Sequence, residues 1–581
     1  MRTKTNGELR LANVGEVVTL TGWVSKKRDL GGVVFIDLRD RYGITQLIVN
    51  PDNKNYDRAL EVKNEYVLKV TGTVVERSNK NKNILTGDIE VEVSELEILN
   101  IAELPPFLIQ DQTDALEETR MRYRYLDLRR PQMQNNMLLR HKTCIAIRNY
   151  LDKLNFIEIE TPFLGKSTPE GARDFLVPSR VHPESFYALP QSPQIYKQLL
   201  MVGGMDRYFQ IARCFRDEDL RADRQLEFTQ VDLEMSFIDE EDIFQVVEGL
   251  LKTVWKETLD MDIPTPFIRM PYAYAMDKYG SDKPDTRFEM LLENISDWAV
   301  KLGLGFFSDA VNNGGAVKAV VAKDAASKYS RKEIDRLTLL AKKYHAGGLA
   351  WLKYENNAFT GSIAKFVTEE LGQELVENLK LTENDLVLIV ADKVENCNSS
   401  LGALRTILAS ELGLIDKDKF NFLWVVDWPL FEYSEEEGRF VAAHHPFTSP
   451  KAGHEEFMVE HPEKAMAKAY DVVLNGYELG GGSIRIHNQD IQARMFEAIG
   501  LDKEEVELKF SYFINALKYG TPPHGGLALG LDRVVMLLTK NNNLREVIAF
   551  PKAASAKCLM SDAPTPVTDK QLAELKIKTV K

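Results

Sequence analysis

The sequence has few cysteines, no long apolar run and no excess of basic residues. Its 581 residues include four cysteines, Cys144, Cys214, Cys397 and Cys558, which are too scattered for a zinc motif or a disulfide framework. No stretch approaches the ~18 apolar residues of a membrane span, and no apolar segment follows a basic start at the N-terminus. We therefore expect a cytoplasmic protein with buried free thiols and no membrane partner.

The net charge of -14 argues against general nucleic-acid binding, because phosphate contacts need lysine and arginine. Net charge is a sum over the chain, however, and a local basic face can bind RNA while acidic surfaces elsewhere set the total. Hydrophobic residues at 44% and charged residues at 28% are ordinary for a globular protein. The length exceeds a single core and predicts about three or four domains.

Two common nucleotide-binding motifs are missing. Gly165-Lys166-Ser167 resembles the end of a P-loop, but Glu160 occupies the position of the required first glycine. Gly303-Leu304-Gly305 lacks the third glycine and the preceding strand of a dinucleotide fingerprint. Neither usual nucleotide fold explains this chain.

The N-terminal part has an all-β pattern. Runs typical of strands lie at Val17–Val24, Val33–Arg39, Thr45–Val49, Tyr66–Val75 and Ile89–Leu99, with a helical piece at Tyr56–Val62. Five strands with a helix in that place predict the Greek-key barrel called the OB-fold, which often binds oligonucleotides.

Cations surround an aromatic residue within this barrel. Lys26, Lys27 and Arg28 precede Phe35, and Arg39 and Arg41 follow it, as in proteins that bind single-stranded nucleic acid. The alternative is that Phe35 belongs to the core and the cations form a solubilising rim.

Changes in amino-acid composition then divide the rest of the chain into segments. Pro105-Pro106 begins a linker that runs to Pro131, and its basic run RMRYRYLDLRRP suits a hinge beside a polyanion. A long helix follows, with apolar residues from Leu138 to Leu154. From about Lys283 to Phe420, helices rich in alanine, glycine and lysine alternate with short apolar strands, which we interpret as an inserted α+β domain.

The stretch Tyr208–Phe237 predicts two strands joined by a charged loop. Gln230, Asp232 and Glu234 share one parity and the intervening apolar residues share the other, so three polar groups lie on one face. The alternative is a solvated hairpin with a charged tip.

The C-terminal third contains two glycine-rich motifs. Gly480–Gly482 permits close approach of the backbone to a ligand, and a helix is expected just before it, around Glu463–Leu474. Gly530-Leu531-Asp532-Arg533 closes a strand and opens an apolar helix, which places Arg533 in a first helical turn suited to anions. The alternative is a purely structural ion pair of Arg533.

Six ordered runs give a definite resemblance. TPEGARDF, ALPQSPQIYKQ, FRDEDLRADRQ-FTQVDLE, HHPF, YELGGGSIRIH and HGGLALGLDR together resemble a bacterial-type aspartyl-tRNA synthetase, a class II aminoacyl-tRNA synthetase of subclass IIb. The resemblance covers nearly the whole chain. It implies a multidomain α+β protein whose catalytic domain is a six- or seven-stranded antiparallel sheet flanked by helices.

The resemblance also implies the domain organisation. The expected parts are an OB-fold anticodon-binding domain at 1–104, a hinge linker at 105–131, a catalytic domain at 132–282 and 421–556, an inserted GAD-like domain at 283–420 and a C-terminal extension at 557–581.

The site residues that the resemblance implies fall into groups by ligand. Catalysis is expected from Arg216, Glu478 and Arg533. ATP is expected to contact Arg216, Asp217, Glu218, Gln225, Phe228, Glu478, Gly530, Leu531, Asp532 and Arg533, with Mg²⁺ on Asp471 and Glu478. Aspartate is expected to contact Glu170, Ser192, Gln194, Lys197, Arg216, Asp232, His444 and Arg485. The tRNA anticodon is expected to contact Arg28, Phe35, Gln46 and Glu90.

The implied function is aspartate–tRNA ligation by a cytoplasmic homodimer. The enzyme would activate L-aspartate with ATP and transfer it to the 3′ end of tRNA(Asp). Lys197 and Arg485 suit the distal carboxylate of aspartate, whereas asparagine would leave both cations partly unpaired. Leu30 resembles the branch that discriminates against tRNA(Asn); the alternative is a non-discriminating tRNA(Asp/Asn) enzyme.

Overall fold

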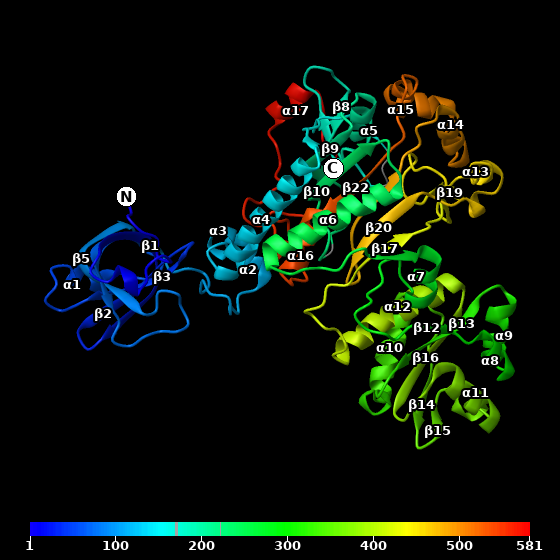
Figure 1. The fold of residues 1–581 in the computed structure, drawn as a ribbon, viewed down its shortest axis with the longest axis horizontal. Helices are drawn as coiled ribbons and strands as arrows, with labels where there is room; N and C mark the ends of the chain where they lie inside the picture. The colour runs from blue at the N-terminus through cyan, green and yellow to red at the C-terminus, as the bar shows by residue number, and fades with distance from the viewer. Residues whose placement is uncertain (169–171, 221, 581) are drawn as a thin grey trace. The chain divides into compact units, whose positions relative to one another are not determined.

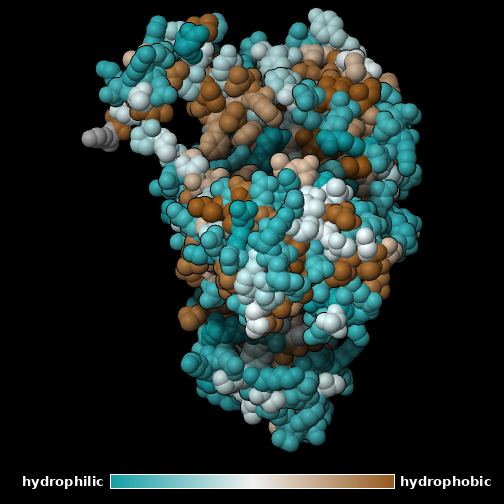
Figure 2. All heavy atoms as spheres, turned by 90° about the vertical axis from the view of Figure 1, so that its left-hand side faces the viewer, coloured by the Kyte–Doolittle hydropathy of each residue, from teal (hydrophilic) through white to brown (hydrophobic). Residues whose placement is uncertain are grey.

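The computed structural model of the protein describes residues 1–168, 172–220 and 222–580. The chain forms two compact units, one of Met1–His141, Leu220–Gln225 and Asn543–Val567 and one of Lys142–Asp219, Leu226–Asn542 and Thr568–Lys581. Within the described ranges no helix is both long and apolar enough to cross a membrane. Side chains on the face in Figure 2 are largely hydrophilic, with hydrophobic ones in small groups.

A closed five-stranded barrel begins the first unit (Figure 1). Its strand order is β1-β2-β3-β5-β4, and its strands are β1 (Val17–Leu30), β2 (Val33–Asp40), β3 (Gly43–Val49), β4 (Val67–Glu76) and β5 (Ile89–Asn100). Helix α1 (Tyr56–Glu61) lies between β3 and β4 along the chain. Alternate residues such as Leu20, Ile36 and Val70 are fully buried and form the core. The predicted OB-fold is confirmed.

The segment predicted to be a linker contains two short helices, α2 (Glu117–Arg122) and α3 (Arg124–Asp127). The long helix α4 (Pro131–Lys153) follows them. The arginines of this segment do not all face solvent. Arg124 and Arg130 are buried and both donate to Asp127, at 2.6 Å each. The prediction that this basic run serves a polyanion is wrong for these two residues, because their charge is used inside the unit.

An eight-stranded sheet is the centre of the second unit in the part of the chain that the structure describes. Its order is β11-β17-β20-β21-β22-β10-β9-β6, antiparallel except for the two edge pairs. The strands are β6 (Ile157–Glu158), β9 (Arg207–Phe215), β10 (Glu227–Ser236), β11 (Ile268–Pro271), β17 (Phe422–Val426), β20 (Ala469–Leu474), β21 (Tyr477–Ile484) and β22 (His524–Gly530). The short edge strands account for the difference from the six or seven strands expected.

Helices and smaller hairpins surround this sheet. The helices are α5 (Gln194–Val202), α6 (Glu240–Leu259), α7 (Tyr272–Tyr279), α13 (Phe457–Glu460), α14 (Gln489–Ala498), α15 (Lys503–Leu517), α16 (Leu531–Leu538) and, near the C-terminus, α17 (Asp569–Leu575). The hairpins are β7 (Leu176–Pro178) with β8 (Phe186–Ala188), and β18 (Phe431–Ser434) with β19 (Arg439–Ala442). Helix α6 contacts β22 and buries Val247, Leu251 and Trp255.

The expected helix at Glu463–Leu474 is wrong. Pro462–Lys464 forms one short 3₁₀ turn, and the strand β20 follows. β20 pairs with both β17 and β21 and is buried along its whole length, so tertiary pairing overrides the helical composition before it. Gly480–Gly482 lies inside the strand β21.

The inserted segment forms a second sheet, in the order β12-β13-β16-β14-β15. Its strands are β12 (Leu292–Asn294), β13 (Ala316–Ala322), β14 (Ala350–Glu355), β15 (Ala358–Gly361) and β16 (Asp385–Asp392). Its helices are α8 (Ser296–Lys301), α9 (Gly305–Asn312), α10 (Arg331–Lys343), α11 (Glu369–Leu379) and α12 (Val394–Glu411).

One buried arginine fixes the start of this insertion. Arg405 of α12 donates to the backbone oxygens of Asp285, Phe288, Glu289 and Met290 at 2.9 to 3.1 Å. Its guanidinium also lies 4.1 Å from the ring centroid of Phe288. The segment that enters the insertion is therefore held against α12.

Candidate active site

The polar face of β10 is buried and carries two carboxylates. Asp232 and Glu234 are fully buried. Their apolar neighbours on the opposite face of the strand, Val231 and Leu233, are fully buried as well. Lys197 of α5 donates to Asp232 Oδ1 at 3.0 Å and lies 3.5 Å from Glu234 Oε2. Both faces of the strand are therefore covered, and charged groups cover the polar one.

Arg485, directly after β21, completes this cluster. Its guanidinium donates to Glu234 Oε1 and Oε2 at 2.9 and 3.1 Å and to Ser483 Oγ at 2.8 Å, and it lies 2.7 Å from His445 Nε2. Burial raises the pKa of Glu234, but Arg485 and Lys197 outweigh burial and the net shift is downward. Asp232, Lys197, Glu234 and Arg485 thus form a neutral row, which we call the buried charge chain.

Polar atoms beside the buried charge chain have unused hydrogen-bonding capacity. Asp232 Oδ2, Gln194 Nε2 and His444 Nε2 are buried and make no hydrogen bond among the described residues. Burial raises the pKa of Asp232 despite Lys197, and burial together with Arg485 lowers the pKa of His444 to about 4. Because buried polar atoms nearly always have partners, this arrangement indicates a site for a small polar ligand.

A second pair of carboxylates lies on β20 and β21. Asp471 is opposite Gly481, and Val473 is opposite Glu478, so the side chains of Asp471 and Glu478 share one face. The pKa of Asp471 is raised well above its usual value, by burial first and then by repulsion from Glu478. A Cβ at position 481 would lie 2.3 Å from Asp471 Oδ1, so the glycine leaves the space that this carboxylate occupies.

These two carboxylates fit Mg²⁺ in its usual nucleotide-bound form. A cation between them would relieve the repulsion that acts on Asp471. The described part of the chain has no group of three or more histidine, cysteine, aspartate or glutamate side chains that could hold a metal alone. Mg²⁺ commonly binds one or two carboxylates together with substrate phosphates, so two carboxylates suffice for that mode.

An arginine and an aromatic ring pair at the start of the charged loop. Arg216 directly follows β9, and its guanidinium lies 5.1 Å from the ring centroid of Phe228 on β10. Arg216 Nε is buried and makes no hydrogen bond among the described residues. Phe228 is half-buried, so its ring keeps an accessible surface.

The start of α16 places a second arginine near the carboxylate pair. Arg533 lies in the first turn of the helix and donates to the backbone oxygen of Glu478. Asp532 is buried and accepts from the backbone N–H of Thr229 at 2.8 Å, which fixes the helix to β10. The predicted strand-to-helix junction is therefore present, and Arg533 reaches β21 from it.

The remaining predicted residues have varied surroundings. Gln225 belongs to the first unit, where its amide exchanges two hydrogen bonds with the backbone of Lys552, at 2.8 and 3.2 Å. Asp217 is exposed, and Glu218 and Ser192 are half-buried. Glu170 lies outside the described residues.

Three of the four residues predicted to read an anticodon form one network on the barrel. Arg28 donates to Asp37 Oδ1 at 2.8 Å and to Gln46 Oε1 at 3.0 Å, and Gln46 donates to Glu90 Oε2 at 2.5 Å. Phe35 is opposite Arg28 in the β1–β2 register and is half-buried. Its strand neighbours Val34 and Ile36 are fully buried, so Phe35 points to the outer face of the barrel rather than into its core.

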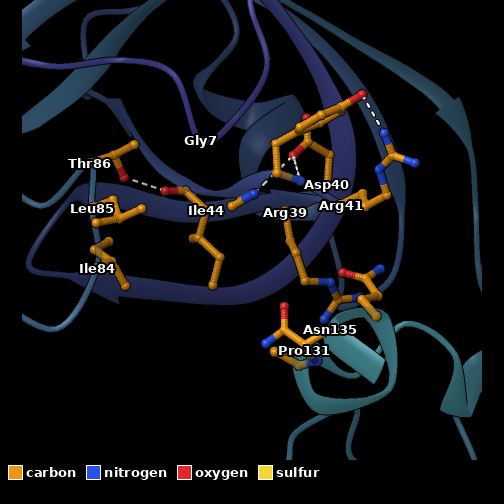
Figure 3. A pocket seen from close by; sticks show the side chains of 13 residues that line it. Gly7, Arg39, Asp40, Arg41, Ile44, Ile84, Leu85, Thr86, Pro131 and Asn135 are labelled. Carbon is orange, nitrogen blue, oxygen red and sulfur yellow. Dashed lines mark hydrogen bonds between the residues drawn. The ribbon is translucent and has the colours of Figure 1, made fainter. Parts of the chain in front are cut away.

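Arg39 and Arg41, which follow Phe35 along the chain, differ in their burial and in their partners. Arg39 is buried and donates to both oxygens of Glu65 at 2.9 Å, so the prediction that it is available to nucleic acid is wrong. Arg41 is exposed and its guanidinium lies 4.7 Å from the ring centroid of Tyr42. Both arginines line a cavity of about 230 Å³, bounded also by Leu85 and the first turn of α4 (Figure 3).

Comparison with known proteins identifies the family of this chain. Residues 116–554 match the family described as tRNA synthetases class II (D, K and N), and residues 18–99 match the OB-fold nucleic acid binding domain. The chain is 56% identical over 583 residues to the aspartate–tRNA(Asp/Asn) ligase of Bacillus mycoides. The alignment covers 99% of this chain and 98% of the relative. The aspartate–tRNA ligase of Macrococcus caseolyticus is likewise 56% identical, over 581 residues, with the same coverage.

The chain belongs to the aspartate–tRNA ligases, within the class II tRNA synthetases. This confirms the family and the enzyme class predicted from the sequence motifs. Two solved asparaginyl-tRNA synthetases, from Pyrococcus horikoshii and Entamoeba histolytica, each in complex with asparaginyl-adenylate, share the fold at 19% identity and a TM-score of 0.58. They cover 94% and 95% of this chain, and 96% and 98% of their own chains are matched.

Sequence reasoning missed several groups of this synthetase's site. Glu234 shares the parity of Asp232, and this parity is the signal for the buried charge chain, but the sequence motifs indicate no role for Glu234. The sequence prediction names His444 of the His-His pair, whereas the residue that contacts Arg485 is His445. Lys197 and Arg485 were expected to be available cations, and both already have carboxylate partners.

Proposed function

We propose that this synthetase activates L-aspartate with ATP and transfers it to tRNA(Asp). The observation that carries the proposal is the buried charge chain with its unused polar atoms. Lys197 and Arg485 suit the side-chain carboxylate of aspartate, and Asp232 Oδ2 suits the ammonium. An asparagine side chain would offer a neutral amide where a carboxylate can accept charge-assisted hydrogen bonds from both cations, so a site of this kind rejects asparagine.

Aspartate-dependent exchange of pyrophosphate into ATP tests this proposal. We expect exchange with aspartate, and at least about 10³-fold less with asparagine, since a site built for a charged group rejects the isosteric neutral one. Lysine should give none, because its ammonium would face Lys197 and Arg485. Comparable exchange with asparagine would contradict the proposal.

We assign the nucleotide to the face that carries Arg216, Phe228, Glu478 and Arg533. The α-carboxylate of aspartate attacks the α-phosphorus of ATP, and pyrophosphate leaves. The 3′-terminal hydroxyl of the tRNA then loses its proton and attacks the acyl carbon of the mixed anhydride, and the bond from that carbon to the phosphate breaks with release of AMP. Arg216 is placed to neutralise charge at the reacting phosphate, and Phe228 to stack with adenine. Asp471 and Glu478 would hold Mg²⁺, which when bound neutralises phosphate charge.

We assign the anticodon to the network of Arg28, Gln46 and Glu90 and to the outward-facing Phe35. A cation, an amide and an aromatic ring on one barrel surface suit unstacked bases. We therefore propose that the barrel contacts the anticodon of tRNA(Asp).

We assign discrimination between tRNA(Asp) and tRNA(Asn) to the tip of the β1–β2 hairpin. Leu30 is exposed there and pairs with Val33 across the turn, so an incoming anticodon would cover it. We propose that the enzyme discriminates against tRNA(Asn). The relaxed alternative remains a candidate, because the relative from Bacillus mycoides is a tRNA(Asp/Asn) ligase at the same identity as the relative from Macrococcus caseolyticus. Charging of both transcripts decides between them, and appreciable aspartylation of tRNA(Asn) would contradict the discriminating assignment.

We also propose that the enzyme is a homodimer. Large apolar side chains are exposed around β6 and the β7–β8 hairpin, namely Ile157, Phe163, Leu164, Leu176 and Phe186. Such a group on a globular protein marks an interaction surface. Sedimentation equilibrium should give a dimer, and substitution of Leu164 by glutamate should produce monomers.

A further inference from the structure

Asn475 and Gly476 form the two-residue turn between β20 and β21. Both have left-handed backbone conformations, with φ angles of 54° and 86°, as the tight turn of a β-hairpin requires. Turns of this kind usually project into solvent, but Asn475 is 7% exposed. The two ends of the inserted segment contact this turn.

The exit end of the inserted segment, residues 419–421, holds the Asn475 side chain at both of its polar atoms. Asn475 Oδ1 accepts from the backbone N–H of Asn421 at 2.9 Å, and Asn475 Nδ2 donates to the backbone oxygen of Lys419 at 2.7 Å. The backbone N–H of Asn475 also donates to the backbone oxygen of Asn421, at 3.4 Å. An Asn-Gly turn forms without such bonds, so they fix the position of the turn rather than its conformation.

The entry end of the inserted segment, which α12 holds by its backbone oxygens, meets the same turn. A Cβ at Gly476 would lie 3.3 Å from Asp285 Cβ. Asn421 Nδ2 donates to the backbone oxygen of Thr286 at 3.0 Å, so the two ends are joined to each other next to the turn. The inserted domain is therefore attached to the turn through both of its ends.

A β-bulge separates this turn from the main part of the large sheet. The β20–β21 register shifts between Val472 and Val473, and Glu478 pairs with Val473 on the turn side of the bulge. The β21–β22 register begins beyond the bulge, at Gly480. Glu478 therefore belongs to a short end of the hairpin whose geometry depends on the turn, whereas Asp471 lies on the sheet side of the bulge.

We propose that Asn475 is a positioning residue of the candidate metal site, through which the two ends of the inserted segment set the place of Glu478 relative to Asp471. This inference rests on the proposed role of those two carboxylates in holding Mg²⁺ with the phosphates of ATP. A bulge changes the direction of the side chains around it, so a hairpin end without a fixed turn would present Glu478 to a cation in several orientations. The inserted domain thus has a part in the activation step without touching a substrate.

The gain in ATP affinity on addition of Mg²⁺ tests this inference. Asn475→Gly keeps the left-handed turn, because glycine adopts a positive φ without strain, but it removes both side-chain hydrogen bonds. Calorimetry of the full-length protein gives the ratio of the Kd values of ATP without and with Mg²⁺. We expect this ratio to fall about tenfold, as when a group that orients a metal ligand is lost. A purely structural role would lower the melting temperature and leave the ratio unchanged, which would overturn the inference.

Asn356→Gly is the matched control. Asn356 begins the two-residue turn between β14 and β15, its φ is 55°, and its side chain is exposed. This variant should leave the ratio unchanged, and a fall equal to that of Asn475→Gly would overturn the inference.

Asn421→Ala tests the inserted segment even if Asn475→Gly does not fold. It removes the hydrogen bond to Thr286 and keeps the backbone groups that bond to Asn475. The ratio should fall about threefold, as for the loss of one hydrogen bond. An unchanged ratio would overturn the part assigned to the inserted segment.

Asp471→Asn distinguishes failure of this inference from failure of the proposed metal site. This variant should lose most of the gain in ATP affinity. If it keeps the gain, the metal assignment itself is wrong and the inference falls with it. If it loses the gain while Asn475→Gly keeps it, the inference alone is wrong.

Discussion

Glu234 accepts two hydrogen bonds from Arg485, at 2.9 and 3.1 Å, in a place where neither side chain reaches solvent. The same carboxylate lies 3.5 Å from Lys197. Glu234 is therefore a positioning residue: it fixes both cations that are assigned to the substrate carboxylate, and together with Asp232 it balances their charge.

Glu234→Gln should destabilise the protein by about 3 kcal/mol, because it leaves a buried charge without its partner. Aspartate-dependent exchange should fall at least about 10²-fold, since Arg485 loses its fixed geometry. Adding Arg485→Met should restore part of the stability but none of the activity. Urea unfolding and pyrophosphate exchange of the three variants check this. A double variant no more stable than Glu234→Gln would show that the two charges do not compensate each other.

Gly481→Ala should reduce activation much more than stability. The Cβ of the new alanine would lie 2.3 Å from Asp471 Oδ1. The Asp471 side chain can rotate to avoid this clash, but its carboxylate then leaves the position assigned to a metal ligand. Gly480→Ala is the matched control, because its Cβ would lie 2.1 Å from the backbone oxygen of Ala528 and must separate two strands. We expect Gly480→Ala to lower the melting temperature and Gly481→Ala chiefly to raise the Mg²⁺ concentration needed for exchange. Similar melting temperatures in both variants would contradict this distinction.

Acidification should destabilise the second unit partly through His444. Burial lowers its pKa to about 4 in the folded protein, below its usual value near 6.5 in the unfolded chain. Between these values the unfolded chain binds more protons, so stability falls as the pH is lowered from about 6.5 to 4.

His444→Gln should lose stability less steeply over this window, by about 1 kcal/mol per pH unit. Trp428, whose ring lies 4.8 Å from that of His444, contributes to the fluorescence that reports unfolding. Parallel curves for the two proteins between pH 6.5 and 4 would show that His444 does not titrate as expected.

Arg28→Ala should impair tRNA charging and leave amino-acid activation intact. The change removes the hydrogen bonds to Asp37 and Gln46 on the barrel, whereas the buried charge chain lies in the other unit. We expect KM for tRNA(Asp) to rise about tenfold to a hundredfold, as for the loss of one good base contact. Exchange of pyrophosphate serves as the internal control. A parallel fall in exchange would mean that Arg28 acts on the whole protein.

The sequence predicted elements with strong periodicity and missed pairings that depend on distant segments. The barrel strands and the β9–β10 hairpin follow from alternation alone. The strand β20 was not predicted because the preceding segment, Glu463–Lys468, has a helical composition. The pairing of β20 with β17 and β21 depends on distant segments and cannot be inferred from the local sequence. The charge of Arg39 gave no sign of its buried partner Glu65, which lies 26 residues away along the chain.

The candidate site shows the same division. Sequence motifs identified Lys197, Asp232 and Arg485, and the strand period placed Asp232 and Glu234 on one face. What the sequence could not give is the partner of each charge, because Arg485 and Glu234 are 251 positions apart. The assigned roles of these residues toward aspartate, ATP and tRNA remain predictions.

The position of β22 has a consequence for how the chain is made. β22 is the last strand of the large sheet along the chain, yet it lies in the interior of the sheet, between β21 and β10. During synthesis, β10 pairs early with β9 but waits for its second neighbour, β22, until about 290 further residues have left the ribosome. Nascent chains that stop before His524 present two long unpaired strand edges, so chaperone dependence and aggregation should be concentrated in this final stage of translation.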